Sequence, residues 1–430
     1  MRNRRDLLVL NCDNSGNLCI FFALLLAYFA RSILAKVFFG NITLPIFYVL
    51  AYGSILIALR LRVRRMNSYL PWLLAIGAVI LFGMFRTGDF SPLYGYLIVI
   101  LLPLTVPDSA VLSKKWITFI LTVTTFIAFG CVLALCFPAL YRSIILPLFK
   151  ENDYRMIMFV LNEGGGGQGG FLSQSGYASY FLCIGIGALY CFKAFFKSKP
   201  TIFFLAVLFI IGLLITQKRS PLVMFILAIL FVYYIDGRGS ERFKRIFYII
   251  LALLGFYFIL SVLVSLGFHI AVLEKVYDVL HGLISGTEIN DTGRTQLYGQ
   301  ATLFFLQNPI FGIGWANYKN LFVLRKTHVH DIYLQLLCET GIIGFTVFMA
   351  FFITNVIRTS KLIRSYSDNQ NSLVYSWLNY SLYIQSFFLL FGITENPLYD
   401  TEDVMLYFFA VGISFAIRSS VKTSRNENVL

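Results

Sequence analysis

Charged side chains are scarce in this chain of 430 residues. Asp, Glu, Lys and Arg make up 13% of the sequence, about half the share of about 25% that is usual in soluble proteins. Hydrophobic residues make up 58%, and the mean hydropathy is +0.76. A soluble protein of this length cannot bury so many apolar side chains, so most of the chain must face lipid. The composition therefore excludes disordered, collagen-like and coiled-coil proteins and predicts an all-α polytopic membrane protein.

Patterns that bind metals or form disulfides are also lacking. The seven cysteines are an odd number, nearly all lie in or beside apolar runs, and no Cys-x-x-Cys pair occurs. Such cysteines are typical of small buried hydrophobic side chains. The sequence also has no HExxH pattern and no Walker loop. We therefore expect neither a metal nor another cofactor.

Long apolar runs are abundant. Runs of roughly 16 to 25 residues match the thickness of a bilayer when they are helical. The N-terminus is basic, but the first run is long, so we expect an uncleaved first helix rather than a signal peptide. About twelve transmembrane helices are expected, at 18–39, 43–59, 69–85, 91–106, 116–137, 175–192, 200–216, 221–235, 246–268, 336–357, 373–393 and 403–417.

The net charge of +14 raises the question of nucleic-acid binding. With the N-terminus in the cytoplasm, the loops of the cytoplasmic side carry 22 of the 35 Lys and Arg residues but only 7 of the 21 Asp and Glu residues. This bias is the positive-inside pattern of membrane proteins and sets the orientation. The charge therefore indicates topology, and we expect no nucleic-acid partner.

Two segments on the predicted outer side are long, at 138–174 and 269–332, within what we expect to be a single membrane domain over 1–430. Loops between membrane helices are often short, so long ones usually carry a function. The second segment holds all four histidines of the chain: His269, His281, His328 and His330.

A cationic turn, Lys218-Arg219-Ser220-Pro221, joins two apolar runs on the outer side. The turn has two interpretations. Its cations can snorkel to lipid headgroups, which is the ordinary behaviour of such residues. Alternatively, they bind an anion, because a guanidinium matches phosphate oxygens and stays charged where water is scarce.

Arg294 stands at the start of a helix predicted over Thr295–Gln307, which we expect to be amphipathic. A cation in the first turn of a helix opposes the helix dipole, and a nearby anionic ligand would remove that conflict. The alternative is an exposed arginine without a function. The glycine-rich stretch Pro309–Gly314 follows.

His328 and His330 precede the run at 336–357. Two histidines without a third ligand are a poor metal site. His330 lies just before a helix start, where the neutral imidazole is favoured, so it is a candidate general base. Asp331 or a neighbouring carboxylate could orient its ring. A purely structural histidine is the alternative.

A glycine-rich run, Gly164 to Gly170, interrupts the first long outer segment. It lacks the ending of a nucleotide-binding loop. We interpret it as a hinge or loose lid over a membrane cavity. A backbone cradle for a diphosphate is the weaker alternative.

Taken in order, these pieces resemble the bacterial superfamily of O-antigen ligases and Wzy-type polysaccharide polymerases. That family shows a Ser-Arg-like turn, an arginine opening a long outer loop, a P-x-F/L-G-x-G stretch and an HNxYLxxxxExGxxG segment. The corresponding residues here are Lys218-Arg219-Ser220, Arg294, 309–314 and 330–344, and the motifs span about 216–345. Asp331 replaces the usual asparagine, and Lys-Arg-Ser replaces the commoner Ser-Arg-Gly.

The resemblance implies a GT-C-type glycosyltransferase that uses a polyprenyl-diphosphate-linked glycan as donor, without a metal or a nucleotide sugar, and inverts the anomeric centre. The diphosphate leaving group needs fixed cations, and the acceptor hydroxyl needs a base. We expect Arg219 and Arg294 to bind the diphosphate with help from Lys218, and His330 to be the base with His328 in reserve. Further residues expected to contact or guide the substrate are Tyr333, Arg86, Arg155 and Arg325.

The resemblance leaves open which of two reactions is catalysed. A polymerase extends a lipid-linked chain, whereas a ligase moves the finished chain to lipid A-core. General likeness of the histidine segment and of the loop Asn396–Asp400 to O-antigen and capsular polymerases favours the polymerase. A flippase or transporter is the rival class, but such proteins tend to place charges at mid-membrane and to show repeated halves.

The expected location is the bacterial cytoplasmic (inner) membrane, with the active site facing the periplasm. The expected partners are undecaprenyl-diphosphate-linked oligosaccharide, membrane lipid and a chain-length regulator.

Overall fold

The computed structural model describes residues 69–90, 96, 100–103, 114–163, 167–172, 174–196, 198–237, 241–267, 271–285, 294–322, 327–366 and 372–427. Within these ranges the regular structure is entirely helical. The expected runs at 18–39 and 43–59 and most of the run at 91–106 lie outside the described residues. So does Arg325.

Five described helices are long and apolar enough to cross a membrane. They are α3 (Leu70–Thr87), α6 (Lys114–Cys136), α11 (Arg219–Asp236), α12 (Glu241–Ser265) and α16 (Ile332–Ser365). Two shorter apolar helices are α9 (Ser175–Cys191) and α10 (Lys199–Ile215). The chain is therefore a polytopic membrane protein, and the count of twelve spans stays a prediction.

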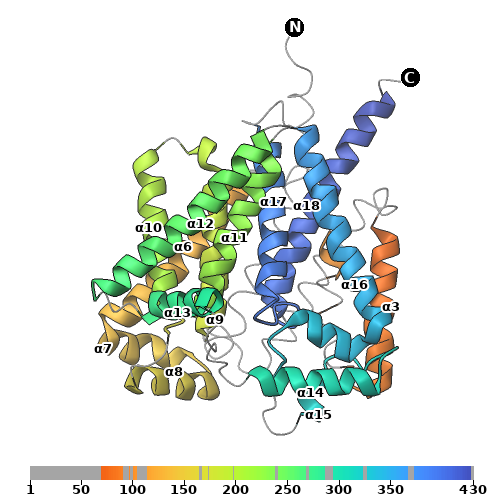
Figure 1. Cartoon of the computed structure of the whole chain (residues 1–430), viewed down its shortest axis with the longest axis horizontal. Helices are drawn as coiled ribbons and strands as arrows, with labels where there is room; N and C mark the ends of the chain where they lie inside the picture. Colours follow the sequence, from red (N-terminus) through yellow and green to blue (C-terminus); the bar gives the residue numbers. More distant parts are fainter. Residues whose placement is uncertain are drawn as a thin grey trace. The chain divides into compact units, whose positions relative to one another are not determined.

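The chain divides into two compact units. The first is drawn from residues up to 118 and from 293 onward, and the second from 119–292. In the first unit α16 packs against α3, against α17 (Leu373–Phe391) and against α18 (Thr401–Glu427). Helix α14 (Arg294–Gln307) lies crosswise against the N-terminal part of α16 (Figure 1). The short helix α15 (Tyr318–Leu321) follows α14.

The predicted helix over Thr295–Gln307 is confirmed as α14. Its buried face carries Leu297 and Ala301, which pack in a cluster with Tyr318. The outward face is mixed, however, because Leu303 and Leu306 are exposed together with Gln296 and Thr302. The expectation of an amphipathic helix is thus wrong for its outer face.

A break divides α16 near its start. Gly341 has φ 64° and ψ −171°, which is far from helical geometry. A Cβ atom at this position would lie 2.2 Å from the carbonyl oxygen of Ile310, so only glycine fits. The break leaves backbone groups of α16 without helical partners, and such groups are costly when buried.

The stretch 309–314 fills this break and satisfies those groups. The N–H groups of Ile313 and Gly314 donate to the carbonyls of Cys338 and Glu339, both at 2.9 Å. In the other direction, the N–H of Ile342 donates to the carbonyl of Pro309 at 2.9 Å. The stretch 309–314 and the break at Gly341 therefore pack directly against each other, although α15 and the start of α16 lie between them in the chain.

The second unit contains the first long segment, 138–174, with its glycine-rich run. Residues after α6 form α7 (Pro138–Leu140), a π-helical turn (Tyr141–Ile145), a 3-10 turn (Leu146–Leu148) and α8 (Glu151–Glu163). Helix α9 packs against α10 and α11, and α13 (Ala271–Ser285) packs against α11 and α12.

The described part of the glycine-rich run, residues 167–170, is not a loose lid. Its backbone packs against α6 and against the end of α10, where the N–H of Gln168 donates to the carbonyl of Ile215 at 3.1 Å. The interpretation as a hinge is therefore wrong for these residues, because backbone contacts hold them on both sides.

Candidate active site

In the first unit, three side chains from distant parts of the sequence form one chain of contacts. Nδ1 of His330 lies 2.8 Å from Oε2 of Glu395, and Oε1 of Glu395 lies 3.3 Å from a guanidinium nitrogen of Arg294. All three side chains are about a quarter to a third exposed, with His330 at 34%. A ligand can therefore reach the ring of the histidine.

The start of α16 places the histidine. His330 has a positive φ of 61°, and the following residue, Asp331, is the N-cap. The Asp331 carboxylate accepts hydrogen bonds from the N–H groups of Tyr333 (2.8 Å) and Leu334 (2.9 Å). An N-cap aspartate satisfies helix donors that would otherwise lack partners. Asp331 thus serves the helix, and the ring of His330 is oriented by another carboxylate, Glu395.

Glu395 is not among the residues predicted from the sequence. It lies in the turn after α17, where its N–H donates to the carbonyl of Phe391 at 3.0 Å. The same turn is joined to α16, because the N–H of Ile332 donates to the carbonyl of Gly392 at 2.8 Å. The only signal was its position directly before the loop Asn396–Asp400, since 65 residues separate it from His330.

His328 is held in a different state from His330. Its Nδ1 lies 3.0 Å from Nε2 of Gln335. The amide orientation of Gln335 is determined by its other partners, since its oxygen accepts the N–H of Val329 and its nitrogen donates to Glu339. Nδ1 of His328 must then be the acceptor, so the proton of the neutral ring sits on Nε2.

Electrostatics keep His328 neutral. The pKa of His328 is lowered to about 4, chiefly by burial and also by the nearby Lys319 and His330, against the opposing effect of the Gln335 hydrogen bond. A group with such a pKa is a weak base at neutral pH. Of the two histidines, His330 therefore has the geometry of a general base and His328 that of a hydrogen-bond donor.

A buried carboxylate on α16, that of Glu339, accepts hydrogen bonds from two loops. Glu339 is fully buried and accepts hydrogen bonds from the N–H groups of Ala316 (2.8 Å) and Tyr318 (3.1 Å). It also accepts from Gln335 and from the Tyr399 hydroxyl. A buried charge needs this number of donors to be tolerated. The glutamate of the motif thus joins α16 to two loops.

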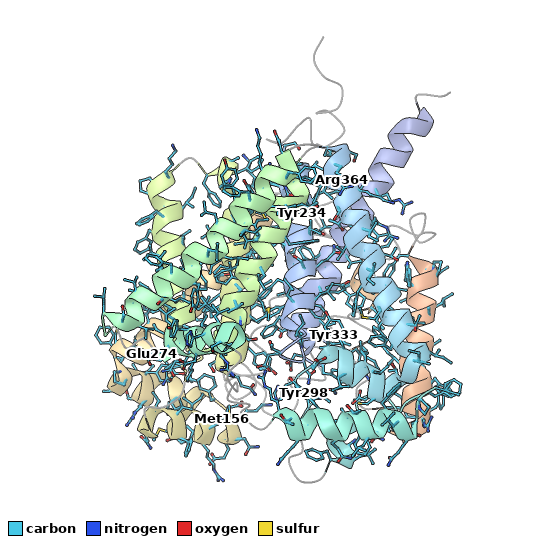
Figure 2. All side chains as sticks on the ribbon, viewed as in Figure 1. Met156, Tyr234, Glu274, Tyr298, Tyr333 and Arg364 are labelled. Carbon is cyan, nitrogen blue, oxygen red and sulfur yellow. The ribbon has the colours of Figure 1, made fainter. Side chains whose placement is uncertain are left out.

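The other residues predicted to contact substrate in this unit have partners within the protein. A guanidinium nitrogen of Arg86 donates to Oδ1 of Asn308 at 2.7 Å. The hydroxyl of Tyr333, which is labelled in Figure 2, donates to the carbonyl of Leu389 at 2.7 Å, and this bond ties α16 to α17. Their roles in substrate binding stay predictions.

The cationic turn lies in the second unit. Lys218 occupies the N-cap position of α11, where it provides no side-chain cap, and Arg219 is the first residue of the helix. Both are partly buried. Unsatisfied N–H groups and the helix dipole make such a helix start attractive to anions, and two cations strengthen this. Arg155, by contrast, forms an exposed pair with Glu151 at 3.0 Å.

No group of three or more His, Cys, Asp or Glu residues in the described ranges is arranged to hold a metal ion.

Residues 204–349 match the family model described as O-Antigen ligase. The matched range contains Arg219, Arg294, His330 and Glu339, whereas Glu395 lies beyond it. The predicted resemblance to the superfamily of O-antigen ligases and Wzy-type polymerases is thereby confirmed. No curated protein matches the chain.

Proposed function

We propose that this chain, which shares the O-antigen ligase domain over residues 204–349, is a GT-C-type polysaccharide polymerase. It transfers a glycan from undecaprenyl diphosphate to the non-reducing end of another lipid-linked repeat unit, at the outer face of the cytoplasmic membrane. The observation that carries the proposal is the contact chain Arg294–Glu395–His330.

The acceptor is a sugar hydroxyl, which is too weak an acid to attack unaided at neutral pH. With Nδ1 of His330 donating to Glu395, the free base site is Nε2. This atom lies 3.4 Å from the Thr327 hydroxyl, a long contact that an acceptor hydroxyl can replace. Nε2 then takes the proton as the new glycosidic bond forms, and Glu395 stabilises the resulting imidazolium.

The leaving group is undecaprenyl diphosphate, whose charge grows as the bond to the anomeric carbon breaks. Fixed cations aimed at this charge lower the barrier. Arg219 and Lys218 supply them at the start of α11. Arg294 has two tasks in this proposal: it contacts the diphosphate, and it holds Glu395 against His330. The reaction needs no metal.

The ligase is the second candidate, because the matching family model bears that description. Both reactions use the same donor and the same base, so the site geometry serves either. The preference for polymerase rests on the likeness of the histidine segment and of the loop Asn396–Asp400 to O-antigen and capsular polymerases. This loop is joined to α16 by a hydrogen bond of 2.8 Å from Asn396 to Gln335. A flippase has no use for a general base oriented in this way.

The test uses purified protein in lipid with undecaprenyl-diphosphate-linked repeat units as the only substrate, and the products are resolved on a gel. A ladder of longer lipid-linked glycans that His330→Ala abolishes is the expected result. Transfer that appears only after lipid A-core is added would instead establish the ligase. Correctly inserted protein that gives no transfer in either condition would overturn both and favour a flippase.

A further inference from the structure

The glycine-rich segment is a motif for which the proposed reaction has no task. We propose that residues 167–170 are a positioning element, whose backbone holds the turn that places Arg219, and that Gly167 is the residue that makes this contact possible. The inference rests on the proposed role of Arg219 in diphosphate binding.

The closest contact is between two backbones. A Cβ atom on Gly167 would lie 1.6 Å from the carbonyl oxygen of Thr216 and 2.2 Å from its carbonyl carbon. The next residue, Gln168, donates its N–H to the carbonyl of Ile215 at 3.1 Å. A backbone neighbour cannot swing aside as a flexible side chain does, so any larger residue at position 167 must push the turn away.

The turn itself depends on outside support. Gln217 has φ 51°, a left-handed conformation that is unfavourable for a residue with a side chain. Such conformations persist only where the surrounding structure holds them. Thr216 is fully buried, and its hydroxyl donates to the carbonyl of Leu213 at 2.6 Å. Two residues then lead from Thr216 to Arg219, so a displaced turn moves the guanidinium.

The other side of the segment is anchored on α6 and the turn after it. The hydroxyl of Tyr141 donates to the carbonyl of Gly170. Phe171 lies against Gly130, where a Cβ atom would come within 2.7 Å of the Phe171 nitrogen, and its ring stacks on Phe126 at 4.2 Å. The segment therefore contacts α6 on one side and the turn that precedes Arg219 on the other.

Backbone support suits an anion-binding arginine. A carboxylate partner would also hold Arg219 in place, as Glu395 holds Arg294, but it would offset part of the positive charge offered to the diphosphate. In the parts of the chain that the structure describes, no ion pair of Arg219 occurs. Packing against a glycine segment orients the turn and leaves the charge in place.

The experiment compares Gly167→Ala with Gly176→Ala in the full chain, purified in lipid. Gly176 lies in the first turn of α9, where an added Cβ meets nothing within 4 Å, so it is the matched control. The readout is release of undecaprenyl diphosphate from undecaprenyl-diphosphate-linked glycan with lipid A-core present, which detects polymerase and ligase alike. Gly167→Ala should lower the rate by about 10²-fold, the effect of a 1 Å misplacement, and Gly176→Ala should leave it unchanged.

A double-mutant cycle with Arg219→Ala separates positioning from general damage. If Gly167 acts through Arg219, Gly167→Ala causes no further loss in the Arg219→Ala background. Losses that multiply would overturn the inference, and so would a wild-type rate for Gly167→Ala. A wild-type rate for Arg219→Ala would contradict the proposed function instead, so the two failures are distinguishable.

A second variant covers the case in which Gly167→Ala does not insert. Tyr141→Phe removes only the hydroxyl that holds Gly170. It should lower the rate several-fold in the wild-type background and leave the rate of Arg219→Ala unchanged. An undiminished rate for Tyr141→Phe alone would overturn the inference.

Discussion

The two units of the molecule hold the side chains proposed to act in catalysis by different means. In the first unit, His330, Glu395 and Arg294 contact one another, and each charge has a partner. In the second unit, Arg219 is placed by backbone packing. The difference fits the chemistry proposed for each: a base must be oriented and its charge balanced, whereas Arg219 offers the diphosphate a full positive charge, more than Arg294 can offer while it is paired with Glu395.

Replacing Glu395 tests the side-chain half of this comparison and should have the largest effect. Glu395→Gln keeps the shape but removes the charge that balances the protonated ring of His330. The transfer rate should fall by about 10²- to 10⁴-fold, as for the orienting carboxylate of a catalytic triad. Initial rates in lipid measure this. Glu151→Gln, which changes an exposed carboxylate of the other unit, should keep the wild-type rate; equal losses in both variants would refute the role of Glu395.

Replacing Arg219 tests the part of the comparison that concerns the second unit. Arg219→Ala removes a cation proposed to bind the leaving group, so the rate should fall by about 10²- to 10³-fold, the usual cost of one charge-stabilising group. Arg219→Lys keeps the charge but not the planar fork and should retain part of the rate. The control is Arg142→Ala, an exposed arginine that binds only a backbone carbonyl among the described residues. A similar loss in the control would show that outer charge in general is needed.

The break in α16 makes a stability prediction for the first unit. Gly341→Ala puts a Cβ atom into the backbone of Ile310 at a positive φ, so it should destabilise the protein by about 1–3 kcal/mol or more. Gly77→Ala in α3, where an added Cβ meets nothing within 4 Å, should be neutral or slightly stabilising because alanine favours helices. Thermal unfolding in detergent compares the two. Equal stability would mean that 309–314 does not fill the break.

The smallest effect concerns His328 and is read from pH. Its lowered pKa of about 4 means that it stays neutral from pH 7 down to about pH 5. Because its pKa is depressed below the ordinary 6.5, its protonation favours unfolding, and stability should decline as pH falls from about 6.5 toward 4. The acid limb of kcat/KM should have the same midpoint in His328→Gln as in the wild type. If His328 were the base, His328→Gln would instead release almost no undecaprenyl diphosphate at any pH.

Much of the fold followed from local patterns, and the site followed less well. Helix α14 begins at the predicted position, and His330 precedes a helix start as expected. Glu395 could not be predicted, because its contact with His330 depends on how α17 packs against α16. Likewise, the glycine run suggested a loose lid. Its own sequence does not reveal that the backbone of another segment packs where Gly167 and Gly170 lack side chains.

The assignment of His330 as the base is tested most directly by chemical rescue. His330→Ala leaves a gap at a side chain that is 34% exposed, so imidazole from solution can enter. If His330 is the base, this variant releases almost no undecaprenyl diphosphate alone. Added imidazole then restores the release, at a rate that rises with the concentration of neutral imidazole. Imidazole should not restore the release of undecaprenyl diphosphate by Arg219→Ala, because that variant lacks a cation and not the base. A wild-type rate for inserted His330→Ala without imidazole would contradict the account.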